Sequence, residues 1–196
     1  MTKLRDVVAV RGGGTPRRST AEFYGGSIPW VTPKDMKRAI VSDSSVRLTQ
    51  AGVDNSPAKL IASGSVLVVV RSGVLKHTLP VALTTAPVTV NQDMKALTPS
   101  AEVHPAFLAR LVKSLQPRVL TWVRATTADN FPIESLLELD VEIPPSTSSA
   151  VSPRSWTGPM PSAQSVAKPS PTSTVSPSRS FTKCSASPTL SGRRSP

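Results

Sequence analysis

The chain has 196 residues, a formal net charge of +11 and a single cysteine, Cys184. One cysteine excludes a disulfide framework and a cysteine-based metal site within the chain, and no segment approaches the roughly 20 apolar residues that span a bilayer. The sequence therefore predicts a cytoplasmic protein with no membrane segment, and its basic charge is consistent with a polyanionic partner without requiring one.

Short strands and a shaped loop are predicted for the first part of the chain. The β-branched run Lys3–Val10 predicts a strand that stops at the three glycines 12–14, and Thr15 with Pro16 opens the following loop. The apolar run Ile28–Val31 predicts a buried strand. Glycine turns and paired arginines without regular periodicity are typical of a loop held for binding.

Two threonines are expected to begin short turns. Thr32 places a hydroxyl before Pro33, the combination of an N-cap with proline at the first helical position, and this predicts a short helical turn. Residues 40–48 are expected to be extended. Thr49 is expected to cap another short turn that ends near Asn55.

The middle of the chain predicts a mixed or antiparallel sheet. Ser65–Arg71 is an unbroken, mostly β-branched run between two glycines, which predicts a strand inside a sheet. Leu79–Leu83 and Val88–Leu97 are further strand candidates.

Helices follow the predicted sheet. In Pro105–Gln116, apolar residues fall at i, i+3, i+4 and i+7, which predicts an amphipathic helix through Leu108, Leu111, Val112 and Leu115. A second helical piece is expected at Arg118–Arg124, and Leu139–Ile143 alternates apolar with acidic residues. Together these patterns predict an α+β domain over residues 1–145.

No catalytic, metal or cofactor site is indicated. The Gly12–Gly14 turn could cradle a phosphate, but it lacks the ending of a P-loop and the spacing of a dinucleotide fingerprint, so a strand-ending turn is favoured. Neither His77 nor His104 has a carboxylate or serine partner at a spacing typical of a triad or a zinc site. A phosphate-handling enzyme stays an alternative, although it lacks an acid/base set.

Two polar pairs are candidates for contacts with nucleic acid. Arg17 and Arg18 suit phosphate or guanine-edge contacts if the partner is DNA, and a solvated charge pair is the default otherwise. Asn91 and Gln92 carry amides that can pair with adenine edges, although a strand-end turn is equally consistent with them. Trp30 lies in an apolar run, where tryptophan is more often buried, and we interpret it as scaffold.

Several segments, taken in order, resemble a target recognition domain of type I restriction-modification DNA specificity subunits. They are GGTP at 13–16, FYGG at 23–26, IPWVTPKD at 28–35, the strand after Gly64 with Arg71, NQDMKAL at 91–97, PAFLARLV at 105–112 and FPIESLLELDVEIPP at 131–145. The resemblance covers nearly all of residues 1–145. It implies an α+β fold with a mixed or antiparallel sheet, short helices and long recognition loops.

The resemblance also implies a function. A subunit of this family holds no catalytic residue and no cofactor, docks methyltransferase and endonuclease subunits, and reads half of a bipartite sequence in double-stranded DNA with each recognition domain. The DNA-facing elements would be the loop Gly13–Asp35, Arg71 with the loop Ser72–Thr78, and Asn91–Lys95. The expected DNA-binding residues are Thr15, Arg17, Arg18, Thr32, Lys34, Arg71, Lys76, Asn91, Gln92 and Lys95.

The resemblance ends at Pro145. The family continues with a Leu-x-Glu-Gln segment into a long docking helix, whereas residues 146–196 of this chain are rich in Ser and Pro and contain no acidic residue. Such a composition cannot bury enough surface to offset the entropy of ordering, so a disordered basic tail is expected.

We interpret this change as the result of a frameshift, a hypothesis that the genetic code permits. The codons TCG ACG AGC AGC GCC GTA TCG CCG AGG TCC encode Ser146–Ser155, and the same bases preceded by one C encode LDEQRRIAEV, which fits the family's continuation. These codons are one choice within the degeneracy of the code. A disordered basic arm that binds DNA is the competing interpretation of the tail. With the frameshift, docking to partner subunits is expected to be impaired, and an inactive remnant or accessory specificity fragment is the alternative function.

Overall fold

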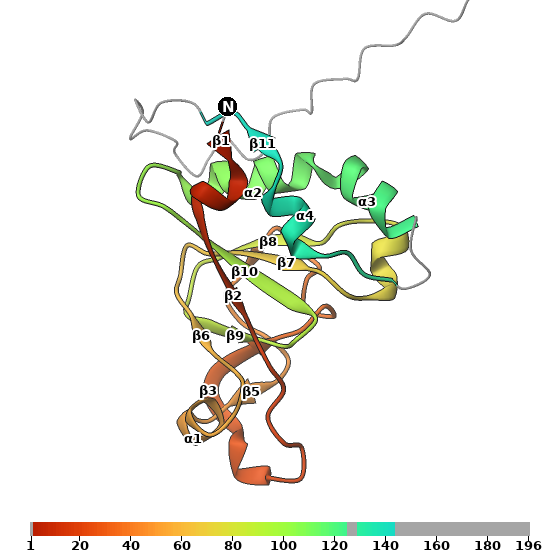
Figure 1. Ribbon diagram of the computed structural model, residues 1–196. Coiled ribbons are helices and arrows are strands. Elements are labelled where there is room, and N and C mark those ends of the chain that lie inside the picture. The colour runs from red at the N-terminus through yellow and green to blue at the C-terminus, as the bar shows by residue number, and fades with distance from the viewer. Residues whose placement is uncertain (1, 125–128, 144–196) are drawn as a thin grey trace, which may run out of the picture. The chain divides into compact units, whose positions relative to one another are not determined.

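The computed structural model describes residues 2–124 and 129–143, and the expected tail at 146–196 lies outside them (Figure 1). The strands are β1 (Thr2–Lys3), β2 (Val8–Gly12), β3 (Tyr24–Val31), β4 (Ile40–Val41), β5 (Arg47–Leu48), β6 (Leu60–Ile61), β7 (Val66–Val69), β8 (Val81–Thr84), β9 (Val88–Val90), β10 (Met94–Pro99) and β11 (Asp140–Val141). The helices are α1 (Gln50–Asp54), α2 (Pro105–Ser114), α3 (Gln116–Arg124) and α4 (Ile133–Leu137), with 3-10 turns η1 (Leu4–Asp6), η2 (Ala21–Phe23) and η3 (Gly73–Lys76).

The strands form mixed sheets. One has the order β2-β10-β7-β8-β4, a second has the order β5-β3-β9-β6, and β1 pairs with β11. The pairs β3–β9 and β4–β8 are parallel, and the other ladders between named strands of the described chain are antiparallel. These elements confirm the predicted α+β class.

The strongest predicted strand lies at the centre of the larger sheet. All residues of β7 are buried between β10 on one side and β8 on the other. A strand covered on both faces needs apolar side chains at every position, and β-branched residues suit its extended backbone. The unbroken run that contains β7 therefore predicts its central place.

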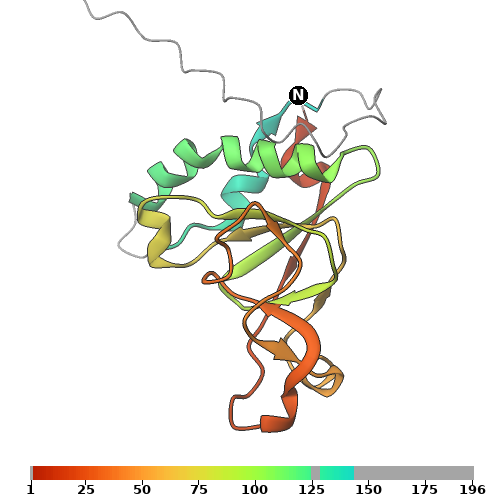
Figure 2. The ribbon, with the colours of Figure 1, turned by 180° about the vertical axis from the view of Figure 1, so that it is seen from behind.

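Two helices cover one end of this sheet. Proline at the first position of α2 follows His104, whose Nδ1 accepts a hydrogen bond from the amide of Ala106 at 3.2 Å. The buried side of α2, formed by Leu108, Ala109 and Val112, packs against β7, β8 and β10. In Figures 1 and 2, α2 and α3 lie end to end on this side, whereas β3, β5 and α1 project at the opposite end.

The single strand expected over Lys3–Val10 was wrong in detail, because the segment forms β1, then η1, then β2. The carboxylate of Asp6 accepts a hydrogen bond from the amide of Lys3 at 3.3 Å, and Leu4 is fully buried. A local hydrogen bond and a buried side chain thus interrupt a run whose composition favours a strand.

The turn expected after Thr32 is present but does not become a helix. The amide of Asp35 donates to the carbonyl of Thr32 at 3.0 Å, and the next helix along the chain is α1. The extended segment expected over 40–48 is limited to β4 and β5, which belong to different sheets. The prediction that Thr49 caps α1 is confirmed, since its hydroxyl accepts from the amide of Gly52 at 3.0 Å.

Candidate nucleic-acid interface

The ends of several strands meet around the turn between β9 and β10. The last residues of β3 and β9 are in register, β7 ends beside the first residue of β10, and the end of β2 pairs with the second. We term residues 12–16, 32, 71 and 91–95 the loop edge. It brings together six of the predicted DNA-binding residues, namely Thr15, Thr32, Arg71, Asn91, Gln92 and Lys95.

Hydrogen bonds close the loop edge. The amide of Asn91 donates to the carbonyl of Val31 at 3.1 Å, which places Asn91 beside Thr32. The amide of Gly14 donates to the carbonyl of Val90 at 3.0 Å, and the Thr15 hydroxyl donates to Oε1 of Gln92. Segments far apart in sequence are therefore joined through their backbones as well as their side chains.

The loop that follows β2 needs glycine to approach β9 so closely. A Cβ atom at Gly13 would lie 1.9 Å from the carbonyl oxygen of Val90, so any side chain would displace the loop. This packing explains the glycine turn by close approach, as expected of a strand-ending turn.

Two aromatic side chains support the same loop. Nε1 of Trp30 donates to the carbonyl of Gly14 at 3.0 Å, and the Tyr24 hydroxyl donates to the carbonyl of Pro16 at 2.8 Å. The rings of Tyr24 and Trp30 meet edge to face with centroids 6.5 Å apart. Trp30 is only 6% exposed, which confirms that it is part of the scaffold.

Arg17 and Arg18 lie beyond these anchors. Both are exposed, and a turn in which the amide of Thr20 donates to the carbonyl of Arg17 at 3.1 Å shapes the segment. Within residues 2–124 and 129–143 neither arginine forms an ion pair. Their charges are available to a ligand.

Arg71 is held by an acidic neighbour. Its Nε donates to Oδ1 of Asp93 at 2.6 Å, and its Nη2 lies 2.6 Å from the same oxygen in an ion pair. Oδ2 of Asp93 accepts from Nδ2 of Asn91 at 2.9 Å. The amide of Asp93 in turn donates to Oδ1 of Asn91 at 3.2 Å. Asn91 is 7% exposed and the Arg71 side chain is 58% exposed. The guanidinium is thus fixed along one edge and open to solvent along the other.

The two predicted lysines near Arg71 have different surroundings. The exposed Lys76 lies on η3, and its ammonium is 3.3 Å from Oδ2 of Asp129. Lys95 is half-buried on β10, and its ammonium lies 3.0 Å from the position that a side chain on Gly12 would occupy. Lys76 is therefore paired, whereas Lys95 lies against the backbone of β2.

Lys34 lies on the loop that leaves the loop edge after Thr32, and Asp35 organises this loop. One carboxylate oxygen of Asp35 accepts from the amide and hydroxyl of Thr32 at 2.9 and 2.8 Å, and the other accepts from the amide and hydroxyl of Ser45 at 3.2 and 3.0 Å. Partial burial alone would raise the pKa of Asp35, but these hydrogen bonds outweigh it and hold the pKa below its ordinary value.

Sequence reasoning missed the roles of two carboxylates. Asp93 holds Arg71, and Asp35 organises the loop that carries Lys34. Asp93 follows Asn91 at a spacing typical of an Asx turn, and Asp35 follows Thr32 at the spacing of a capping box, so weak local signals existed. Neither signal names the distant partner, Arg71 or Ser45.

The described residues give no sign of metal or membrane chemistry. Between residues 2 and 143, outside the gap at 125–128, no group of three or more His, Cys, Asp or Glu could hold a metal ion. In the same part of the chain, no helix has the length and apolarity that crossing a bilayer requires.

Residues 1–149 match the family described as type I restriction modification DNA specificity domain. The specificity subunit of the type I restriction enzyme EcoR124I/EcoR124II from Escherichia coli is 38% identical over 134 residues, which are 68% of this chain and 33% of that protein. The specificity subunit of the type I restriction enzyme MjaIX from Methanocaldococcus jannaschii is 30% identical over 115 residues, 57% of this chain and 26% of that protein. The chain spans about a third or less of the length of these relatives.

Solved structures show the same fold. The HsdS subunit from Thermoanaerobacter tengcongensis superposes with a TM-score of 0.56 at 19% identity, over 74% of this chain and 32% of that one. A chain from a study of complex assembly and conformational transition of the type I R-M system gives a TM-score of 0.57 at 21% identity, over 74% and 33%.

Proposed function

Because the chain belongs to the family of type I restriction modification DNA specificity domains, we propose that residues 1–145 form a target recognition domain that binds one half of a bipartite site in double-stranded DNA. The observation that carries the proposal is the loop edge, where residues from five strand ends gather within a segment that the family covers completely. We place DNA against this edge and the loops that leave it.

The contact residues follow from the chemistry of each side chain. The guanidinium of Arg71 presents donors, and the amide of Gln92 a donor and an acceptor, that suit base edges. Asp93 holds one edge of the guanidinium and leaves the other edge open. Phosphate contacts are assigned to the exposed or half-buried cations Arg17, Arg18, Lys34, Lys76 and Lys95. Thr15, Thr32 and Asn91 are the remaining proposed DNA-binding residues. The role of Asn91 is indirect, because its hydrogen bonds position Asp93, which holds Arg71.

The domain is proposed to perform no chemistry itself. Methyltransferase and endonuclease subunits of a type I complex are its proposed partners, and double-stranded DNA in the cytoplasm is its ligand. This assignment is supported by the similarity of the chain to specificity subunits of type I restriction enzymes.

Selection from a random duplex library tests the proposal. We expect the purified full chain to enrich a short sequence and to bind it weakly, with an affinity that falls steeply as salt rises. Binding that is insensitive to salt, or no binding to any duplex at low ionic strength, contradicts the proposal.

We also propose that residues 146–196 are translated in a shifted frame. The change of composition at Pro145 supports this origin, as does the reading LDEQRRIAEV that one added base gives to one permitted set of codons for Ser146–Ser155. Sequencing of the gene tests it directly. A nucleotide sequence in which no single-base change restores a family-like frame would refute the frameshift.

Loss of the family's continuation is proposed to impair docking. We expect the chain to fail to co-purify with a methyltransferase subunit of its own system, and a frame-restored version of the gene to recover co-purification. Equal recovery by both versions would show that docking does not depend on the shifted segment. DNA binding is measured separately, so an inactive remnant is distinguished from a recognition domain without partners.

A further inference from the structure

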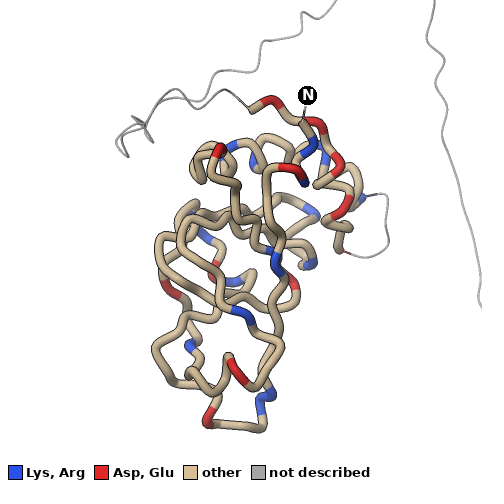
Figure 3. Tube along the Cα trace, turned by 60° about the vertical axis from the view of Figure 1, so that its left-hand side comes forward, with Lys and Arg blue, Asp and Glu red and all other residues tan. Residues whose placement is uncertain are grey.

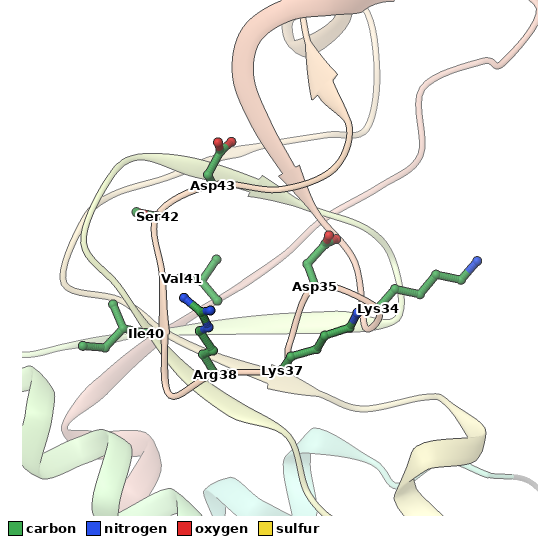
Figure 4. Close-up of a pocket in the computed structure, with 8 residues that line it drawn as sticks. All are labelled: Lys34, Asp35, Lys37, Arg38, Ile40, Val41, Ser42 and Asp43. Atoms are coloured by element: carbon green, nitrogen blue, oxygen red, sulfur yellow. The ribbon is translucent and has the colours of Figure 1, made fainter. Parts of the chain in front are cut away.

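Three cations lie close together on the loop that follows β3. Lys34, Lys37 and Arg38 are exposed, and none of the three forms an ion pair with another of the described residues. Together with neighbouring residues they line an open hollow of about 330 Å³. Figure 4 shows that Lys34 and Lys37 extend to the same side of the loop, whereas Arg38 turns back over Val41.

The two carboxylates of the hollow are bound elsewhere. Asp43 is 2.6 Å from Nη2 of Arg47, and hydrogen bonds from Arg47 and from the amide of Ser44 lower its pKa. Asp35 accepts hydrogen bonds from Thr32 and Ser45, as described above. Both carboxylates thus remain charged without binding the lysines, and with Arg47 the charged groups around the hollow keep a surplus of positive charge.

The loop is held in place before any ligand binds. Asp35 ties its start to Ser45, and the amide of Leu83 on β8 donates to the carbonyl of Ala39 at 2.8 Å, which fixes its end. Met36 packs against the core between these points. A loop already ordered loses less conformational entropy on binding, so cations on it bind a polyanion more tightly than cations on a free segment.

The loop also lies next to the loop edge. It leaves β3 at Val31, whose carbonyl accepts from the amide of Asn91 in the loop edge. It ends at β4, which pairs with the last residues of β8, beside the start of β7. A duplex bound at the loop edge therefore has the first part of this loop, which follows Thr32, beside it. The first of its three cations, Lys34, already belongs to the expected contact set, whereas Lys37 and Arg38 do not.

We propose that Lys34, Lys37 and Arg38 form a phosphate clamp for the backbone of double-stranded DNA, held in position by Asp35. The proposal rests on the proposed function of the loop edge and adds to it a contact that is independent of sequence. Lysine and arginine ammonium and guanidinium groups donate to phosphate oxygens, and neutralising each phosphate releases condensed counterions.

The test measures the salt dependence of DNA affinity by fluorescence anisotropy, with the full chain and a labelled duplex of mixed sequence between about 50 and 200 mM salt. The triple variant K34A/K37A/R38A should reduce the slope of log affinity against log salt by roughly 2 to 3, because each lost phosphate contact is worth about 0.9. The duplex of mixed sequence and a duplex that carries the selected sequence should lose affinity by the same factor.

A control variant removes the same charge from helices α2 and α3, which do not line the hollow. R110A/R118A/R124A on α2 and α3 should change the slope by less than about 1. Equal slope changes for the two triple variants would show that net charge alone is responsible and would overturn the clamp, while leaving the proposed function intact. Absence of binding by the unmodified chain would instead overturn the proposed function together with the clamp.

A second variant tests the role of Asp35. Asp35→Asn makes the chain more positive, so charge alone predicts tighter binding to DNA. If Asp35 positions the clamp, affinity falls severalfold while all three cations are retained. Unchanged or tighter binding by this variant, in a protein with an unchanged circular dichroism spectrum, would overturn the positioning role.

Discussion

Lys3 and Arg5 lie at one end of the domain, and Arg17 and Arg18 lie on a loop that leaves the loop edge. At the first place, which we term the clasp (residues 2–6 and 138–141), Lys3 is 3.7 Å from both Glu138 and Asp140, and Arg5 is bonded to Glu138. At the second, the arginines have no acidic partner within the described residues. The same residue type therefore closes the fold at the clasp and is left available for a ligand near the loop edge.

Charge distribution follows this division. Glu134, Glu138, Asp140 and Glu142 occur without an intervening cation in the segment that packs near the N-terminal strand, and Figure 3 shows acidic positions gathered there. Cations predominate around the loop edge and its loops. A polyanion is therefore attracted to the loop edge and its loops, whereas the acidic segment, paired in part with Lys3 and Arg5, offers it no surplus of positive charge.

The largest effect should come from the scaffold beneath the loop edge. Trp30→Ala removes a buried ring and its hydrogen bond to Gly14, so the free energy of unfolding should fall by about 3–5 kcal/mol. Trp122→Ala, at a half-buried position on α3, is the control and should cost less. Urea unfolding followed by circular dichroism measures both. Equal costs would mean that the loop does not depend on Trp30.

Local patterns were enough to predict much of the fold. β7 and α2 follow from an unbroken β-branched run and from apolar spacing, and the cap at Thr49 follows from one hydroxyl, because each signal lies within the element it predicts. The burial of Trp30 follows in the same way from its apolar neighbours.

The architecture of the loop edge could not be predicted in this way. Its organising contacts join Arg71 to Asp93 and the Gly14 amide to Val90, across long separations in the chain. The parallel pairing of β3 with β9 has no local signature either. The sequence resemblance predicts which segments face DNA, whereas the partners that orient these segments could be found only from the three-dimensional arrangement.

The second-largest effect is expected at Arg71. This residue is ion-paired, like the cations of the clasp, and exposed, like Arg17 and Arg18. Arg71→Ala should weaken binding to the selected sequence by about 1–3 kcal/mol, while binding to unrelated duplexes changes less. Competition binding with selected and scrambled duplexes measures the difference. An equal loss on both duplexes would make Arg71 a phosphate contact.

Asp93→Asn then shows what the ion pair does. If Asp93 orients Arg71, the variant should lose specificity even though it gains positive charge, as the guanidinium is released from two 2.6 Å contacts. If Asp93 instead competes with DNA for Arg71, the variant should bind all duplexes more tightly. The sign of the change decides between the two roles.

A smaller effect per residue is expected for Arg17 and Arg18. The variant R17A/R18A should lower the salt slope of DNA binding by about 1.8 without changing the free energy of unfolding, since neither side chain has an acidic partner among the described residues.

The clasp variant K3A/R5A should affect stability and not the salt slope of DNA binding. It should destabilise the fold by up to about 1 kcal/mol and leave the slope nearly unchanged. A slope change of equal size in both variants would remove the distinction between the two ends.

The smallest expected effect is the pH dependence of stability contributed by Asp35. Its pKa is lower in the folded state than in the unfolded chain, because Thr32 and Ser45 donate to the charged form. Its contribution is therefore fully present above the unfolded pKa of about 4 and is lost as the pH falls through the lower folded value.

Asp35→Asn should consequently lower the free energy of unfolding at pH 7 by about 1 kcal/mol or less, a value kept small because the carboxylate is partly exposed to solvent. The difference from the unmodified chain should shrink as the pH falls below about 4, where the unfolded carboxylate takes up a proton first, and should be lost below the lower folded pKa. Urea unfolding at a series of pH values measures it, with the exposed Glu22→Gln as control. A difference that persists unchanged at low pH would mean that the amide disturbs the loop by its shape, and that the charge of Asp35 does not stabilise it.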